Sequence, residues 1–441
     1  MKKTLRIGVA VAAASAIALT ACGNGGGGGA ASGEISYWLW DAAQLPAYQQ
    51  CADDFAKANE GVTVKITQTG WGDYWGKVTN GMAAGTAPDV FADHLAKYPD
   101  FVKTKQLAEI SEDGVDMAGF ADGLADLWVG QDGKRYGLPK DWDTVALFYN
   151  KDMVKEAGIS DDEMANMTWN PQDGGSYEKI IAKLTVDKNG KRGDEAGFDK
   201  NNVAVFGLGL PGAGAGNGQT EWFSFVGTTG WRHTDTNPWD TKFNYDDPRF
   251  QESIDWWAGL IEKGYMPRLD TTVGASMNDN FGAGKSAINM NGSWMINTYF
   301  GYKGIDTGIA PTPAGPEGRV SMFNGLADSI WVGSKNQENA TKWVKYMASD
   351  ACQDVVGEMG VVFPARKAGT EKASAAFAAK DIDVTPFTMH VADGTTALFP
   401  ISENAAKIEG IMQPAMDSVL SGNVPASSLT AANEQVNALF N

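Results

Sequence analysis

Short apolar strands alternate with amphipathic helices over the first hundred residues. Residues 34–40, 62–67 and 89–92 are predicted strands, and helices are expected from Pro46 to about 59 and from Asp73 onward. Proline is tolerated in the first turn of a helix, and aspartate is a common helix N-cap. Because strands that alternate with helices pair mainly in parallel, this pattern predicts an α/β fold.

The carboxyl ends of these three predicted strands carry aromatic and polar residues. They are Trp40 with Asp41, the segment 68–73, and Asp93 with His94. In parallel α/β sheets, ligands bind in the crevice beyond the carboxyl ends of the strands. The sequence therefore predicts a binding crevice at this edge of the sheet.

The size and charge of the chain exclude several classes of protein. A chain of 441 residues exceeds what one core usually holds, so two domains or lobes are expected. The net charge of -18 has the wrong sign for holding a phosphate backbone, so we expect no nucleic-acid partner. No apolar run reaches the ~20 residues that cross a bilayer, which argues against an integral channel or permease.

The N-terminus has the pattern of an export signal. Three basic residues precede an apolar stretch at 7–19, and Leu19-Thr20-Ala21-Cys22 resembles a bacterial lipobox, which predicts lipidation of Cys22. Residues 1–21 are then a cleaved signal peptide, and the Gly-rich segment 22–33 a flexible tether. The alternative is an ordinary signal peptide with an incidental cysteine.

Two further cysteines, Cys51 and Cys352, lie on the apolar stripes of predicted helices. Burial as free thiols explains both residues. In an oxidising exterior two remaining cysteines can also form a disulfide, so both states stay open.

A glycine-rich segment and an acidic cluster resemble known motifs only in part. Residues 207–212 fit G-x-G-x-x-G, but Pro211 interrupts the segment and further glycines follow, so we expect a flexible loop at the crevice and no nucleotide. The acidic residues after Asp187 resemble a calcium loop, but Lys191 and Arg192 occupy positions that need an oxygen ligand and glycine. A solvated hairpin is expected there, with a structural calcium left open.

Catalytic centres are not recognisable in the sequence. The three histidines, His94, His233 and His390, lack the spacing of zinc ligands. No pair of carboxylates stands out as the acid and base of a glycosidase. We therefore expect no metal, no cofactor and no catalytic activity.

Tryptophan is the strongest functional signal. The chain has 15 tryptophans, several of them in expected loops beside polar residues: Trp38 to Asp41, Trp71 to Asp73, Lys140 to Asp143, and Asn291 to Trp294. An indole face accepts the C–H face of a pyranose, while neighbouring carboxylates and amides bind its hydroxyls. Trp75, Trp256, Trp257 and Trp343 instead fall on apolar helix faces and are expected in the core.

A series of short motifs resembles the family-1 extracellular solute-binding proteins, the maltose-binding-like lipoproteins of carbohydrate ABC importers. The motifs are Ala87-Pro88-Asp89-Val90, Tyr136-Gly137-Leu138-Pro139 followed by Leu147-Phe148-Tyr149-Asn150-Lys151, Phe281 to Ala287 leading to Asn291-Gly292-Ser293-Trp294, Ala310-Pro311-Thr312-Pro313, and Phe363-Pro364-Ala365-Arg366. Each motif is weak alone. Together, in this order and behind a lipobox, the motifs make a strong resemblance that spans nearly all of the mature chain.

The resemblance implies a two-lobed, periplasmic-binding-protein-like type II fold with a ligand cleft between the lobes. The N-terminal lobe would comprise 34–143 and 326–365, and the C-terminal lobe 144–325 and 366–441. Crossings between the lobes are expected near 142–147, 324–327 and 364–367. Cys51 and Cys352 would share one lobe, which favours the disulfide.

Family members trap a sugar when the lobes close on it. The residues expected to face the cleft are Trp40, Asp41, Gln44, Trp71, Asp73, Asp93, His94, Asp141, Trp142, Asp143, Gln219, Trp222, Asn291, Trp294, Asn324 and Arg366. For Asp143 and Arg366 the alternative is an ion pair at the hinge. The resemblance implies a monomeric oligosaccharide receptor that delivers its ligand to an ABC permease. A lipid would anchor this receptor to the extracellular face of a Gram-positive membrane.

Two rival functions remain. One is a cell-surface glycoside hydrolase, which would generate new reducing ends from oligosaccharides. The other is a peptide or amino-acid receptor of the same fold, for which a clear charged clamp for the ligand termini would be expected.

Overall fold

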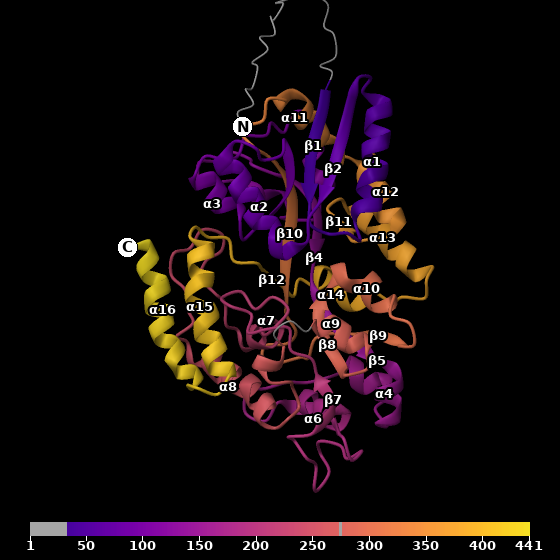
Figure 1. Ribbon diagram of the computed structural model, residues 1–441, viewed down its shortest axis with the longest axis vertical. Coiled ribbons are helices and arrows are strands. Elements are labelled where there is room, and N and C mark those ends of the chain that lie inside the picture. The colour runs from indigo at the N-terminus through magenta and orange to yellow at the C-terminus, as the bar shows by residue number, and fades with distance from the viewer. Residues whose placement is uncertain (1–32, 273–275) are drawn as a thin grey trace, which may run out of the picture.

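The computed structural model describes residues 33–272 and 276–441. The predicted signal peptide 1–21, the lipidation site Cys22 and all but the last residue of the predicted tether lie outside the described residues. Figure 1 shows two α/β lobes, one above the other, each built around its own sheet. Among the described helices none is long and apolar enough to span a bilayer.

The first lobe contains a seven-stranded mixed sheet. Its order is β11-β4-β10-β3-β1-β2, with β12 paired to β10. Its strands are β1 (Gly33–Leu39), β2 (Val62–Gln68), β3 (Val90–His94), β4 (Leu138–Asp143), β10 (Ser321–Ile330), β11 (Phe363–Pro364) and β12 (Thr396–Leu398). Strand β1 pairs in parallel with β2 and β3, as the first hundred residues predict, but β10 runs antiparallel to β3 and β4.

Helices cover this sheet, and a disulfide joins two of them. They are α1 (Leu45–Ala58), α2 (Trp71–Ala84), α3 (Tyr98–Lys103), α11 (Gln337–Met347), α12 (Asp350–Met359) and α13 (Lys367–Ala378). Cys51 on α1 and Cys352 on α12 are fully buried and bonded to each other. Of the two states left open by the sequence, the structure has the disulfide, which links segments 301 residues apart.

The second lobe contains a five-stranded sheet of order β6-β7-β8-β5-β9. Its strands are β5 (Val145–Asn150), β6 (Val186–Asp187), β7 (Val203–Leu208), β8 (Ser286–Gly292) and β9 (Thr307–Ala310). Its helices are α4 (Lys151–Glu156), α5 (Asp161–Ala165), α6 (Gly175–Leu184), α7 (Phe223–Val226), α8 (Pro248–Glu262), α9 (Met277–Gly282), α10 (Ile296–Phe300) and α14 (Thr385–Ala392). The last two helices, α15 (Ala405–Leu420) and α16 (Leu429–Asn437), flank α8 at the side of this lobe (Figure 1).

Strands that pass between the sheets place polar side chains at the lobe boundary. Strand β4 ends at Asp143 in the first sheet, and β5 begins two residues later in the second. Strand β10 lies beside this crossing, with Asn324 opposite Asp143 and the hydroxyl of Ser321 accepting a 2.8 Å bond from the amide of Val145. Asp143 and Asn324 are therefore held together where the lobes meet.

Three local expectations are wrong. Residues 140–143 form strand β4 instead of a loop, and Trp71 is the first residue of α2 instead of a loop residue before it. Asp73 therefore lies in the first turn of α2, and Gly70 is its N-cap.

The glycine-rich segment 207–212 has no helix directly after it. After β7 ends at Leu208, no helix begins until Phe223. A dinucleotide fingerprint needs a helix directly after the turn, so this segment has no phosphate-binding helix terminus.

Candidate functional site

An aromatic cluster lies at the carboxyl ends of β1, β2 and β3. The ring of Trp40 packs edge-on against Trp71 and Tyr74, with centroids 5.2 Å apart in each case. Trp71 also contacts Trp75 and His94, each at 5.5 Å. Its side chain remains 49 % exposed, whereas Tyr74 is fully buried. The cluster thus supports one indole whose remaining surface is free to stack on a ligand.

A chain of polar side chains extends from this cluster into the first lobe. Gln44 donates a 3.0 Å hydrogen bond to Asp41, and Lys140 bonds to Gln44. Lys140 also pairs with Asp141 at 2.7 Å and lies 4.2 Å from the ring centre of Tyr48. Burial lowers the pKa of Lys140, but Asp141, Tyr48 and Asp328 together outweigh this effect and the net shift is upward.

A second polar network crosses the lobe boundary. Asp143 accepts a 2.6 Å hydrogen bond from Gln219, which lies in the loop after β7 of the second lobe. Its other oxygen is 3.0 Å from the amide nitrogen of Asn324, which is also 3.1 Å from Nε2 of His94. Burial, and then the charge of Asp141, raises the pKa of Asp143 well above its usual range. Burial lowers the pKa of His94 to about 3, so the imidazole is neutral. The network suits an uncharged ligand.

Asp93 lies beneath this network. It is fully buried, and one carboxylate oxygen accepts a 2.8 Å bond from the amide of His94. Burial raises the pKa of Asp93 to about 8, and burial also raises that of Asp328, in β10 of the same sheet, to about 7. Asp93 therefore positions His94 and has no exposed surface for a ligand.

Because of these buried acids, we expect the free energy of unfolding to fall as the pH rises from 6.5 to 8. In this window the folded state keeps protons on Asp93 and Asp328 that the unfolded chain has released, so unfolding releases protons and rising pH favours it. The histidine contribution has the opposite sign, because burial lowers all three histidine pKa values. The unfolded imidazoles are still half protonated at pH ~6.5, so this contribution offsets part of the fall until they are neutral.

The free energy of unfolding should be about 1–3 kcal/mol lower at pH 8 than at pH 6.5. Urea titrations at both values measure it. The substitution Asp93→Asn, which cannot ionise, should flatten the slope. A slope unchanged in this variant would show that Asp93 is ionised in the folded protein.

In the second lobe, Asn291 and Trp294 lie close to the crossing. Strand β8 places Asn291 opposite Ala146 and Gly292 opposite Val145 of β5. The half-buried indole of Trp294 lies so close to Gly292 that an added Cβ would be 1.9 Å from the ring. Gly292 therefore permits this position of Trp294 beside the lobe boundary.

Other predicted site residues are occupied with packing. Trp142 is 3 % exposed, stacks on Phe363 at 4.8 Å and donates to Thr370. Trp222 is fully buried, with Trp231 and Phe250 at 5.7 and 5.1 Å. Neither indole has a face left for a ligand, so we leave both out of the candidate site.

The alternative of an ion pair between Asp143 and Arg366 is wrong. Arg366 is buried in the first lobe, where it pairs with Asp116 at 2.8 Å and with Asp350. It also donates to the backbone carbonyl of Asp116 at 3.1 Å. Its guanidinium holds three segments of one lobe together, so Arg366 is also left out of the candidate site.

Sequence reasoning missed two residues of the site. Phe399 packs against His94 at 5.1 Å, and Trp75, expected only in the core, contacts both Trp71 and His94. Phe399 comes from a segment 305 positions later in the chain, and nothing in its local sequence indicates this contact. Trp75 fits both roles, because it lies on the apolar stripe of α2 near its first turn.

The residues that the structure describes contain no group of three or more His, Cys, Asp or Glu arranged to hold a metal ion. The acidic hairpin has another explanation. The carboxylate of Asp187 accepts bonds from the amides of Asn189, Lys191 and Asp199, at 2.8, 2.9 and 2.9 Å. These bonds lower the pKa of Asp187 despite its burial and use its oxygens within the loop.

Comparisons with known proteins agree with this architecture. Residues 50–384 match the family model of bacterial extracellular solute-binding proteins. The maltodextrin-binding protein MdxE of Bacillus subtilis (strain 168) is 26 % identical over 333 residues, which are 72 % of this chain and 70 % of that protein. The lactose-binding protein of Rhizobium radiobacter is 27 % identical over 151 residues, only 32 % of this chain and 34 % of that one.

Among solved structures, the substrate-binding protein Lmo0181 from Listeria monocytogenes, in complex with cycloalternan, has a TM-score of 0.78 at 18 % identity. The match covers 93 % of this chain and 99 % of that one, and at this identity it shows a shared fold. The family match extends over most of both lobes and includes the aromatic cluster from Trp71 onward. The chain therefore belongs to the bacterial extracellular solute-binding protein family.

Proposed function

We propose that this protein captures an oligosaccharide between its lobes and delivers it to an ABC importer. The observation that carries the proposal is the half-exposed indole of Trp71, which lies on an aromatic cluster next to the network joining Asp143 to Gln219. Stacking on indole and hydrogen bonding by buried polar groups are the interactions that an uncharged sugar needs. The maltodextrin- and lactose-binding relatives support the choice of sugar.

The candidate contact set is drawn from the aromatic cluster and from the two polar networks beside it. In the first lobe it comprises Trp40, Asp41, Gln44, Trp71, Asp73, His94 and Asp141, and around the crossing and in the second lobe it comprises Asp143, Gln219, Asn291, Trp294 and Asn324. A ligand that contacts both lobes stabilises the closed arrangement, because only that arrangement offers both sets of contacts. We propose that the lobes divide at the crossings predicted near 142–147 and 324–327, with Arg366 and α13 in the first lobe.

The remaining parts of the proposal concern delivery. Cys22 would carry the lipid that keeps the body on the extracellular face of the membrane, and residues 22–33 would leave it free to turn. The protein would act as a monomer without catalysis and present its closed form to the permease.

Isothermal titration with a panel of di- to pentasaccharides tests the function. Saturable binding of at least one oligosaccharide supports it, and peptides of similar length serve as the comparison for a peptide receptor. A reducing-end assay on the same mixtures separates binding from hydrolysis. Turnover at catalytic rates, or binding of peptides alone, would contradict the proposal.

Trp71→Ala should weaken oligosaccharide binding by ~1–3 kcal/mol, because the stacking surface is lost. Melting should change little, since the side chain is half exposed. Val332→Ala is the matched control, because Val332 is 51 % exposed in the same lobe and lies outside the candidate site. Unchanged affinity in the Trp71 variant would remove this indole from the site.

A further inference from the structure

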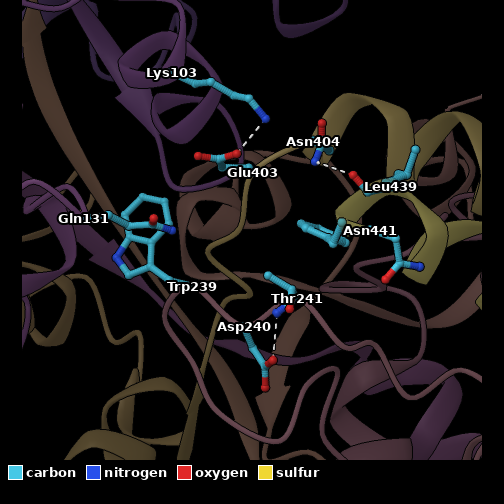
Figure 2. Close-up of a pocket in the computed structure, with 10 residues that line it drawn as sticks. Lys103, Gln131, Trp239, Asp240, Thr241, Glu403, Asn404, Leu439 and Asn441 are labelled. Carbon is cyan, nitrogen blue, oxygen red and sulfur yellow. Dashed lines mark hydrogen bonds and ion pairs between the residues drawn. The ribbon is translucent and has the colours of Figure 1, made fainter.

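A cavity of about 290 Å³ lies at the lobe boundary beside α3 and the C-terminal helices. Figure 2 shows Lys103 and Gln131 of the first lobe facing residues of the second. The second lobe contributes Trp239, Asp240 and the pair Glu403 and Asn404, with Leu439 and Phe440 forming an apolar side. None of the lining residues belongs to the candidate sugar site.

Two of the lining residues have left-handed backbones. Trp239 has a φ of 73° and Asn404 a φ of 64°, and only three other non-glycine residues in the described ranges have positive φ. A bulky residue in this region is an outlier that persists only when its surroundings hold it there. Strain of this kind is concentrated at ligand sites.

Several hydrogen bonds hold the Trp239 backbone in place. Its amide donates to the carbonyl of Ile401 at 2.8 Å. The side chain of Asn237 donates to the carbonyls of Leu398 and Phe399 and accepts from the amide of Ile401. The loop is thus fixed to the chain segment 398–401, and the indole is held at the cavity.

The charges around the cavity are already compensated. Lys103 and Glu403 pair at 2.6 Å. The carboxylate of Asp240 accepts bonds from the amides of Thr236, Thr241 and Lys242 and from the Thr236 hydroxyl, and these bonds lower its pKa despite burial. The charged side chains that line the cavity are therefore already paired or hydrogen-bonded. The cavity offers an indole, the amide side chains of Gln131, Asn404 and Asn441, and hydrogen-bonding oxygens, the combination that suits a neutral polyhydroxy compound.

The size and construction of the cavity narrow the choice further. Its volume is near the lower end of the ~300–1,000 Å³ range of ligand pockets, so it has room for one sugar ring. Contacts between the lobes surround it: the Lys103–Glu403 pair, the amide of Asn404 donating to Asp100 at 2.9 Å, and the rings of Tyr98 and Trp239 at 5.8 Å. Both lobes are needed to build its walls.

We propose that this cavity is a second binding site, for a single neutral pyranose, with the indole of Trp239 as its stacking surface. It is separated from Trp71 by His94, Phe399 and the segment at Ile401. A sugar in this cavity touches both lobes and stabilises the arrangement in which they meet, independently of the oligosaccharide at the first site.

Saturation-transfer NMR with D-glucose tests the second site. The four proteins to compare are wild type, Trp71→Ala, Trp239→Gly and the double variant. Glycine adopts φ 73° without strain, so Trp239→Gly removes the indole while the fold is retained. Far-ultraviolet circular dichroism and melting curves check that retention. Gln131→Ala, an exposed truncation on the opposite wall, is a second variant that cannot disturb the core.

We expect a glucose signal in Trp71→Ala. The signal should fall at least fivefold when Trp239→Gly is added to Trp71→Ala, and it should also fall clearly when Gln131→Ala is added to Trp71→Ala. No glucose signal in Trp71→Ala, or a signal that Trp239→Gly leaves unchanged, overturns it. Failure of the proposed oligosaccharide function is a separate result. In that case wild type shows no saturable binding of any oligosaccharide in the titration, whatever the glucose experiment gives.

Discussion

Trp222→Ala should lower the free energy of unfolding by ~3–5 kcal/mol, the cost typical of truncating a fully buried tryptophan. The side chain is 0 % exposed and packs against Trp231, Phe250 and His233, so its removal leaves a cavity that these rings cannot easily fill. Urea unfolding followed by circular dichroism measures the change.

Trp71→Ala is the matched control, because it makes the same substitution at a half-exposed position. The two variants should show opposite patterns: Trp222→Ala loses stability and keeps its oligosaccharide affinity under folding conditions, whereas Trp71→Ala keeps stability and loses affinity. A Trp222 variant of normal stability that fails to bind sugar would place this indole in the binding site after all.

Removal of the disulfide should produce the second large effect. The double variant Cys51→Ala/Cys352→Ala should lose ~2–5 kcal/mol of stability, because the bond constrains a loop of about 300 residues in the unfolded chain. Wild type unfolded and refolded in the presence of reductant is the control, since it keeps both sulfur atoms in the core. Equal stability of oxidised and reduced wild type would contradict a contribution from the bond.

Much of the first lobe could be predicted from the sequence. The strands β1 to β3 were recognisable because apolar and β-branched residues are bounded by turn residues and followed by amphipathic helices. Local periodicity is sufficient for such elements. It does not account for the exposure of Trp71, which lies four residues before Trp75 and therefore on the same helix face as Trp75, Val78 and Met82.

The strand β4 shows what local patterns cannot reveal. Its residues Lys140, Asp141 and Asp143 make it resemble a solvated loop, yet all three are buried. Lys140 is compensated by Gln44, and Asp143 by Gln219 and Asn324, all of them distant in the sequence. Asp141 pairs with its neighbour Lys140. Burial of polar groups is tolerated when they are hydrogen-bonded, and such partners are visible only in three dimensions.

The tryptophans show the same limit at the candidate site. Trp222 and Trp142 follow polar or glycine-rich segments, as an exposed binding tryptophan would, but partners from other parts of the chain cover both. Phe363, which stacks on Trp142, is 221 positions away in the sequence. Composition identified the indole chemistry, but only tertiary packing distinguishes a stacking surface from a core residue.

A crystal structure of the complex with the oligosaccharide selected by titration tests the central claim most directly. The account predicts that one sugar ring stacks on Trp71 while the same ligand bonds to Gln219, Asn291 or Trp294 across the boundary. An oligosaccharide that lies on an outer surface, or that contacts one lobe alone, would contradict capture between the lobes.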